Sequence, residues 1–394
     1  MRLVFQDLSF EDRKDLVRVN LYKIFFLEIP KDELSGFQRC QGHEIFFDIE
    51  DEKRAMALFL RVLDKHLPKL KNSLTGKKAV YIHRNSNIPL IGNVSFGIVD
   101  RNTTLIEVKP ITGCNLSCIY CSVNQDRRVV DFVVEKDYLV EELQKLVALK
   151  GAKGLEIHIN SNGEPLLYEP LDSLIKDIHD IPEVSVISID TNATLLTKEK
   201  VDSLIRSGLN RFNVSLNAID PECSEMIAGK PYNVGKVISI CKYIAQNAEL
   251  LIAPVFLPTI NDQELIKLIQ FANSLKARIG FQNFLSYKDG RNPVKALPMA
   301  KFFEKLWKLE KLTGTRLVCS ESDFNIRKTL PLRKPFSKGD RLKAEIVCDG
   351  RLPKEKIATA LGRSIALPNC DKTGSVLIRI TGDKHNIFYG AVKT

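Results

Sequence analysis

From about residue 103 onward, short segments rich in β-branched and aromatic residues alternate with amphipathic helical segments. This alternation is typical of βα units, in which each helix returns the chain so that the next strand joins a parallel sheet. The segments that read as strands are 104–109, 155–160, 184–190, 211–216, 250–256 and 279–284. We therefore expect an α/β fold with a partial parallel (β/α)6 barrel, whose functional residues lie at the carboxyl ends of the strands.

The helical segments between these strands support the same fold. Apolar residues recur three and four positions apart in two of them, at Leu139, Leu143, Leu146 and Val147 and at Leu265, Leu268, Ile269 and Ala272. Such a stripe covers one face of a helix and packs against a sheet. Another helix starts after Thr197, a favourable N-cap residue, and Gly208 can end it in a left-handed conformation.

Further regions flank the expected barrel, which we place at 100–325. Residues 1–95 contain mixed helical and strand patches around 9–19 and 52–67, and they predict a compact α+β element with no assigned function. Near the other end, Pro331, Pro335 and Gly339 interrupt the chain before a series of short apolar runs. These runs lie at 342–347, 364–367, 375–381 and 386–392. Short strands with polar turns predict a small β-barrel at 333–394, closed or nearly so.

Charge distinguishes this last region from the rest of the chain. The net charge of the whole chain is +10, and residues 333–394 hold 13 Lys or Arg against 6 Asp or Glu. Most of the excess positive charge therefore lies in the small barrel. Such a charge favours binding of a negatively charged partner. No apolar run approaches the length of a membrane span, and the first residues lack the features of a signal peptide. We expect a cytoplasmic protein.

Three of the nine cysteines form a C-x3-C-x2-C motif directly after the first strand of the expected barrel: Cys114, Cys118 and Cys121. Thiolates suit iron, and three of them can hold three irons of a [4Fe-4S] cluster and leave the fourth iron open. The alternative is a zinc site, but such sites usually show paired C-x2-C spacings and a fourth ligand nearby. The motif favours an iron–sulfur cluster at the barrel mouth.

The other six cysteines are scattered: Cys40, Cys223, Cys241, Cys319, Cys348 and Cys370. Because none of them forms a C-x2-C or C-x-C pair, no second cluster site is visible. We expect most of them to be small buried residues. A catalytic role stays open for Cys319, Cys348 or Cys370.

With these motifs in order, the chain resembles the radical S-adenosylmethionine superfamily, in particular the branch of the molybdenum cofactor enzyme. Tyr120 fills the aromatic position before the last cysteine, and the run 161–165 is similar to the Gly-Gly-Glu-Pro motif. Polar segments also follow or end the later strands, as in this family, and they lie at 190–193, 214–217 and 258–264. Two residues depart from its pattern, since Asn162 and Ala193 replace glycines.

The resemblance implies that S-adenosylmethionine binds the open iron and is reductively cleaved to a 5′-deoxyadenosyl radical, which abstracts hydrogen from a substrate. It implies an electron donor such as ferredoxin or flavodoxin. The cofactor contacts that it implies are Tyr120, Gly163, Glu164, Pro165, Asp190, Asn192, Ser215 and Asn217. No catalytic residue beyond these contacts is assigned.

The basic region 333–394 resembles a TRAM domain, a small β-barrel found on RNA-modifying enzymes. A barrel with Lys and Arg on one face can follow a phosphate backbone, so we expect RNA, such as tRNA or rRNA, as the substrate. Phe388 or Tyr389 could stack on a base, although the barrel core is the favoured position for each. Two alternatives stay open: a radical enzyme acting on a small metabolite, cofactor precursor or lipid, and an RNA-binding protein with a structural cluster.

Overall fold

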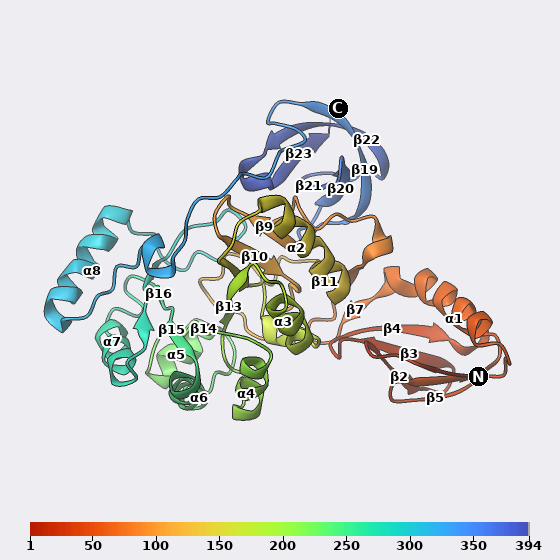
Figure 1. Ribbon diagram of the computed structural model, residues 1–394, viewed down its shortest axis with the longest axis horizontal. Helices are drawn as coiled ribbons and strands as arrows, with labels where there is room; N and C mark the ends of the chain where they lie inside the picture. The colour runs from red at the N-terminus through yellow and green to blue at the C-terminus, as the bar shows by residue number, and fades with distance from the viewer. Residues whose placement is uncertain (393–394) are drawn as a thin grey trace.

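A seven-stranded sheet forms the middle of the molecule in the computed structural model, which describes residues 1–392 (Figure 1). In spatial order its strands are β17 (Arg278–Ile279), β15 (Glu249–Ile252), β14 (Arg211–Val214), β13 (Val184–Thr191), β12 (Leu155–Ile159), β10 (Leu105–Lys109) and β9 (Gly97–Asp100). All neighbours are parallel except β9, which pairs antiparallel with β10. The sheet curls into a half barrel, which confirms the predicted fold class.

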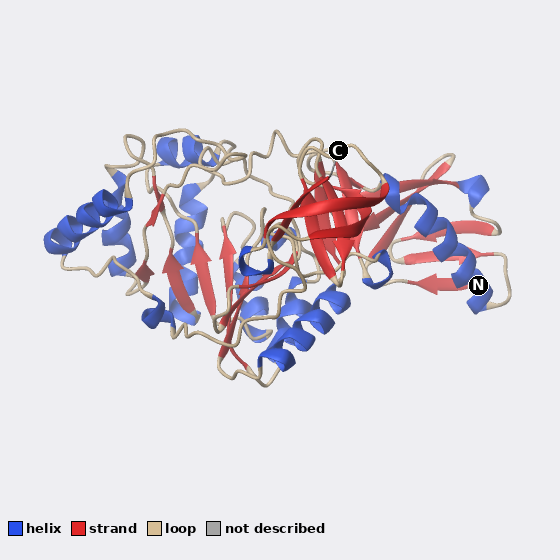
Figure 2. Cartoon of the chain, turned by 90° about the horizontal axis from the view of Figure 1, so that it is seen from above, coloured by secondary structure: helices blue, strands red, loops and turns tan. Residues whose placement is uncertain are grey.

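Helices connect the parallel strands of this sheet (Figure 2). They are α2 (Lys136–Lys150), α3 (Leu171–His179), α4 (Lys198–Arg206), α5 (Pro221–Ala228), α6 (Val234–Asn247) and α7 (Glu264–Ser274). The predicted apolar stripes of α2 and α7 are buried. At the start of α4, Thr197 Oγ1 accepts the Lys200 N–H at 3.2 Å, which confirms the predicted cap.

Two predicted strands are each broken in the structure. The segment 250–256 contains β15 and β16 (Val255–Phe256), and the segment 279–284 contains the end of β17 and β18 (Gln282–Asn283). Pro254 lies at the first break, where it lacks the N–H group that a continuous ladder requires. β16 and β18 pair with each other as a separate two-stranded parallel sheet.

The N-terminal region is an α+β element, as expected. Its strands are β1 (Arg2–Val4), β2 (Leu8–Asp12), β3 (Leu16–Leu21), β4 (Phe25–Pro30), β5 (Phe37–Gln41), β6 (Glu44–Phe47), β7 (Lys71–Asn72) and β8 (Lys78–Ile82), and its helix is α1 (Glu52–His66). The larger sheet takes its edge strand, β11 (Val130–Val134), from the chain that follows the cysteine motif. The N-terminal sheet therefore extends into the central part of the chain.

The C-terminal region is a closed five-stranded barrel, which confirms the predicted architecture. Its strands are β19 (Arg341–Asp349), β20 (Lys356–Ala360), β21 (Arg363–Leu367), β22 (Gly374–Gly382) and β23 (Phe388–Val392). The sequence prediction missed β20, because its Lys-Ile-Ala-Thr-Ala run has two alanines and little strand propensity. Phe388 lies fully buried in the barrel core, and its ring centroid is 4.4 Å from that of Phe336.

The barrel is docked on the segment that precedes the central sheet. The Ser364 N–H donates to the Ile91 carbonyl at 2.9 Å, and the Phe388 N–H donates to the Gly92 carbonyl at 2.8 Å. Gly92 has a φ of +129°, and a Cβ atom there would lie 2.1 Å from the Ser364 carbonyl oxygen. Only glycine permits this approach of the two backbones.

Between α8 (Met299–Thr313) and the barrel, the chain passes the segment that precedes β10. The Thr104 N–H donates to the Arg327 carbonyl at 2.8 Å, next to the start of β10. Within residues 1–392, none of the helices combines the length and the apolar character that a membrane crossing requires.

Candidate active site

The loop that carries the three cysteines spans residues 110–129, between β10 and β11. Its first residues pair with β11: the Thr112 N–H donates to the Phe132 carbonyl at 3.0 Å, and the Phe132 N–H donates to Thr112 Oγ1 at 2.8 Å. Because β11 belongs to the N-terminal sheet, the cysteine loop is attached to both sheets.

A buried ion pair fixes the far end of the cysteine loop. Arg128 and Asp131 have side chains 1% and 0% exposed, and Arg128 Nε lies 2.8 Å from Asp131 Oδ1. The contact is an ion pair rather than a hydrogen bond, since Nε has no well-aligned acceptor. Arg128 also donates to the Thr112 carbonyl, and Asp131 accepts from Thr112 Oγ1 at 3.1 Å and from Asn72 Nδ2 at 2.8 Å. The network ties both ends of the loop together.

The middle of the cysteine loop rests against the end of α5. The Ser117 N–H donates to the Ala228 carbonyl at 3.1 Å. Gly229 follows with a φ of +64°, and a Cβ atom there would lie 2.2 Å from the Ser117 carbonyl oxygen, so a larger residue would push the loop away. From the other side, Arg291 Nη1 donates to the Ser117 carbonyl at 2.7 Å, and the Arg291 N–H donates to the Cys121 carbonyl at 2.9 Å.

A single cavity at the carboxyl ends of the strands brings most of the predicted site residues together. They are Cys114, Cys118, Tyr120, Cys121, Gly163, Glu164, Asp190, Asn192 and Ser215. Pro165 does not line this cavity; it is buried and begins a short 3-10 helix, Pro165–Leu167. Asn217 does not line the cavity either. Its Nδ2 donates to the hydroxyl oxygen of Tyr120, a lining residue, at 3.0 Å.

The three thiols fit an iron–sulfur cluster chemically. Burial raises the pKa of Cys114 and of Cys118 to about 12, so these thiols stay neutral until a cation binds them. Iron supplies such a cation, and binding then releases the protons. Among residues 1–392, no three His, Cys, Asp or Glu side chains lie close enough to hold one metal ion. A [4Fe-4S] cluster does not require three side chains around one metal ion, because each thiolate binds a different iron.

The loop after β12 lies directly against the cysteine loop. A Cβ atom on Gly163 would lie 2.1 Å from the Gly113 carbonyl oxygen, and the Glu164 N–H donates to the same carbonyl at 2.7 Å. The Glu164 carboxylate accepts the Asn192 N–H at 2.8 Å and the Thr191 hydroxyl at 2.7 Å, so it joins this loop to the end of β13. Burial raises the pKa of Glu164 to about 7.

Asp190, near the end of β13, is held by a histidine on the neighbouring strand. His158 Nε2 lies 3.1 Å from Asp190 Oδ2, and Asn213 Nδ2 donates to Asp190 Oδ1 at 2.9 Å. Burial alone would raise the pKa of Asp190, but the charge and hydrogen bond of His158 outweigh it and keep that pKa below its ordinary value. A charged carboxylate therefore faces the cavity, ready to accept hydrogen bonds from hydroxyl groups.

The structure describes both residues that replace glycines of the family pattern. Asn162, in place of the first glycine, donates from Nδ2 to the Val94 carbonyl at 3.3 Å. Ala193 has a φ of +59°, the left-handed conformation that glycine adopts without strain.

Several residues that organise the site carried no recognisable sequence signal. Asp131 and Arg291 hold the cysteine loop through contacts that join distant segments, and Arg128 contacts Asp131 and the Thr112 carbonyl. Asn115 accepts from Asn192 Nδ2 at 3.0 Å, which links the loop to β13. Periodicity and motif spacing do not report such contacts.

The six other cysteines do not enter this site. Cys319, Cys348 and Cys370 do not line the cavity. Only Cys241 and Cys370 are buried, Cys319 is exposed, and the remaining three are half-buried. The expectation that most of the six are buried was therefore wrong, since short apolar side chains also occupy partly covered positions.

Comparisons with known proteins agree with this geometry. Residues 108–272 match the model of the family described as the Radical SAM superfamily. An uncharacterized protein of Methanocaldococcus jannaschii is 34% identical over 97% of this chain and 96% of its own length. The GTP 3′,8-cyclase of Campylobacter jejuni subsp. doylei is 31% identical over 47% of this chain and 57% of its own length. The chain thus spans little more than half of that cyclase.

The similarity to solved structures is weaker. The crystal structure of Streptococcus suis SuiB bound to precursor peptide SuiA aligns with a TM-score of 0.45 and 16% identity, over 80% of this chain and 72% of that chain. Members of the superfamily are enzymes that use a [4Fe-4S] cluster and S-adenosylmethionine. The half barrel, the cysteine loop at its mouth and the family match lead to one conclusion: this chain belongs to the radical S-adenosylmethionine superfamily.

Proposed function

We propose that Cys114, Cys118 and Cys121 hold the [4Fe-4S] cluster and that the polar groups around their cavity hold S-adenosylmethionine. The backbone of the loop 163–165 is suited to the amino group of the methionine part, because the loop lies against the cysteine loop. Asp190, Asn192 and Ser215 line the same cavity and are suited to the ribose and carboxylate groups. When bound, S-adenosylmethionine and the reduced cluster would supply a 5′-deoxyadenosyl radical for hydrogen abstraction from a substrate.

The substrate that the surface supports best is RNA, bound through the C-terminal barrel. The observation that carries this proposal is a pair of arginines on the outer surface of that barrel. Arg341 on β19 lies directly opposite Arg379 on β22, and both are exposed. Like charges in directly opposed positions destabilise a sheet unless an anion lies over them. A phosphate backbone supplies such an anion.

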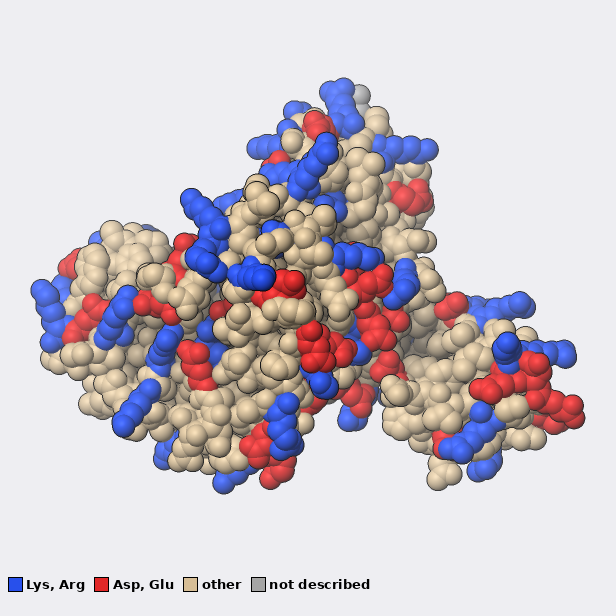
Figure 3. Space-filling model, viewed as in Figure 1, with Lys and Arg blue, Asp and Glu red and all other residues tan. Residues whose placement is uncertain are grey.

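The charge around this pair has the same sign. Figure 3 shows Lys and Arg side chains spread over the C-terminal barrel, with fewer Asp and Glu side chains among them. Lys338 and Lys343 are exposed close to the arginine pair in the sequence. Counterion release by such a surface gives affinity for nucleic acid without sequence specificity. The barrel would hold the RNA while the cavity of the half barrel carries out the reaction.

A second candidate is an enzyme acting on a small molecule. It is favoured by the 31% identity to the GTP 3′,8-cyclase, which covers 47% of this chain. In that case the basic barrel would close the active site rather than bind RNA. The two candidates differ in one expectation: only the RNA-modifying enzyme changes the modified nucleosides of cellular RNA.

The test is mass spectrometry of the nucleosides of purified tRNA and rRNA, from cells with and without the gene. We expect one modified nucleoside to disappear in the deletion strain, to return with the wild-type gene, and to stay absent with Cys118→Ala. An unchanged nucleoside profile would reject RNA as the substrate and favour the small-molecule candidate.

A further inference from the structure

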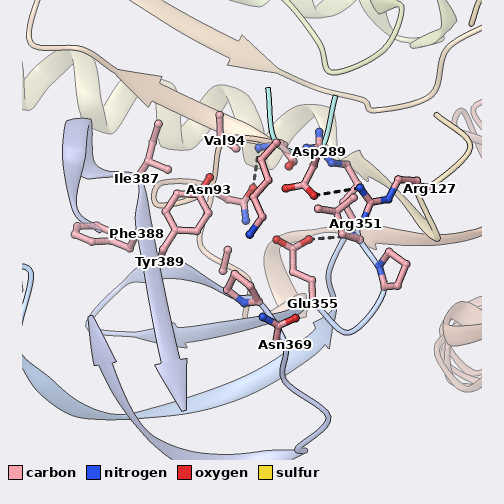
Figure 4. Close-up of a pocket in the computed structure, with 16 residues that line it drawn as sticks. Asn93, Val94, Arg127, Asp289, Arg351, Glu355, Asn369, Ile387, Phe388 and Tyr389 are labelled. Atoms are coloured by element: carbon pink, nitrogen blue, oxygen red, sulfur yellow. Dashed lines mark hydrogen bonds and ion pairs between the residues drawn. The ribbon is translucent and has the colours of Figure 1, made fainter. Parts of the chain in front are cut away.

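A second cavity, of about 480 Å³, lies between the C-terminal barrel and the central part of the chain. Figure 4 shows Asn93 and Tyr389 on one side of it, and Arg127, Asp289 and Arg351 on the other. The volume lies within the range of roughly 300–1,000 Å³ typical of ligand pockets. Because the wall combines segments that are far apart in the sequence, the cavity exists only when the barrel is docked.

Arg351 is the residue of this wall that most strongly indicates a ligand. Its Nε and Nη1 atoms are buried and have no hydrogen-bond partner among residues 1–392. The carboxylate of Glu355, which also lines the cavity, accepts the Leu352 N–H at 3.0 Å. Buried guanidinium nitrogens without hydrogen-bond partners are costly, and an anionic ligand would remove that cost. The planar fork of arginine matches the oxygens of a phosphate.

The rest of the cavity fits the other parts of a nucleotide. Arg127 and Lys288 add positive charge to the wall, and Arg127 Nη1 is 3.7 Å from the Asp289 carboxylate. Tyr389 is 37% exposed, so its predicted place in the barrel core was wrong. Phe388 lies in that core as predicted, and the two differ because neighbouring residues on a strand point to opposite faces. An exposed aromatic ring can stack on any base.

This cavity shares its walls with the cavity of the cysteines. The Val129 N–H of the cysteine loop donates to the Arg351 carbonyl at 2.9 Å, and the Asn124 N–H donates to the Asp289 carbonyl at 3.1 Å. Asn162, which lines the cysteine cavity, donates to the Val94 carbonyl of this one. A ligand here would therefore lie beside the site at which the radical forms.

We propose that this cavity binds one nucleotide of the substrate, with Arg351 binding its phosphate and Tyr389 stacking on its base. The inference rests on the proposed function, because it assigns the position of the nucleotide that reacts. The same chemistry is present in a free ribonucleotide and in a nucleotide within an RNA strand, and the two sources are separated by experiment.

The experiment measures equilibrium binding to the reconstituted protein under anaerobic conditions. The probes are the four ribonucleoside 5′-monophosphates, the corresponding nucleosides without phosphate, and unmodified tRNA transcripts. The variants are Arg351→Gln and Tyr389→Ala, with Arg61→Gln as the matched control, since Arg61 is an exposed arginine of α1. Thermal unfolding of each variant is measured in parallel.

We expect a monophosphate or the tRNA to bind more tightly than any nucleoside, and Arg351→Gln to weaken that binding about 10- to 100-fold. Tyr389→Ala should weaken it about tenfold, and Arg61→Gln should not change it. Arg351→Gln should keep or raise the thermal midpoint, because it removes two buried nitrogens that have no hydrogen-bond partner. Wild-type affinity in Arg351→Gln, binding of neither phosphate probe, or a lowered midpoint with unchanged affinity would overturn the proposal.

The result also separates this inference from the proposed function. If only tRNA binds in an Arg351-dependent manner, the nucleotide comes from RNA and both proposals stand. If a free monophosphate binds in that manner and cellular nucleoside profiles are unchanged, the cavity assignment stands and the RNA substrate is rejected. If the tRNA modification depends on the gene but survives in Arg351→Gln, the function stands and the cavity assignment is rejected.

Discussion

Replacement of Asp131 by asparagine is expected to destabilise the protein and to loosen its cysteine loop. Asp131 is fully buried and compensates the charge of Arg128, whose side chain is 1% exposed. Asparagine preserves the shape but leaves the guanidinium buried without a counter-charge. Removal of one partner of a buried ion pair costs about 3–5 kcal/mol in the free energy of unfolding. With a urea dependence of about 3 kcal/mol per molar, the unfolding midpoint falls by on the order of 1 M.

The assay is urea unfolding followed by far-ultraviolet circular dichroism, together with the iron content after reconstitution. The matched control is Glu304→Gln on α8, which removes one carboxylate from an exposed ion pair with Lys308 and should leave the midpoint unchanged. In Asp131→Asn, iron content should fall with stability, because the ion pair fixes the end of the loop that carries the cysteines.

A double-mutant cycle then tests the physical reason for this loss. Arg128→Met combined with Asp131→Asn removes both charges, so we expect it to be more stable than the sum of the single changes predicts, by about 0.5–3 kcal/mol. If Asp131→Asn unfolds at the midpoint of Glu304→Gln, or if the two single changes are additive, the buried pair does not hold the loop and the reasoning is refuted.

Three further outcomes follow from the site and the surface. Glu164→Ala should weaken S-adenosylmethionine binding in an equilibrium assay but retain iron, because its carboxylate joins the loop after β12 to β13; loss of iron would contradict that role. Gly229→Ala should reduce iron content, since its Cβ would lie 2.2 Å from the Ser117 carbonyl, and full occupancy would show that the loop can shift freely. Arg341→Glu with Arg379→Glu should lower tRNA affinity and reduce the slope of its salt dependence by about 1 per arginine, and an unchanged slope would remove the barrel face from the RNA proposal.

Much of the fold could be predicted from the sequence because it depends on local patterns. The alternation of strands and helices predicted the parallel strands of the half barrel, and the short apolar runs predicted the C-terminal barrel. The errors occurred where a pattern was weak or interrupted. Pro254 broke a strand whose apolar run continued on both sides, and β20 was missed because alanine favours strands poorly.

The site was predictable only where its residues follow a motif. The cysteines and the run 161–165 have fixed spacing, and the structure brings them to one cavity. Asp131 and Arg291 act through contacts across long sequence separations, which neither spacing nor periodicity reveals, and Arg351 belongs to no motif. The place of Tyr389 was predicted wrongly, since its face of β23 depends on the strand register, and a shift of one residue exchanges the buried and exposed faces.

The most direct test of the central claim is the production of 5′-deoxyadenosine by the reconstituted, reduced protein. Wild-type protein and Cys241→Ala, which changes a buried cysteine outside the cavity, should both cleave S-adenosylmethionine. Cys114→Ala, Cys118→Ala and Cys121→Ala should each lose the cluster and the cleavage. Cleavage retained in any one of these three variants, or none by the wild-type protein with its cluster in place, would contradict the account.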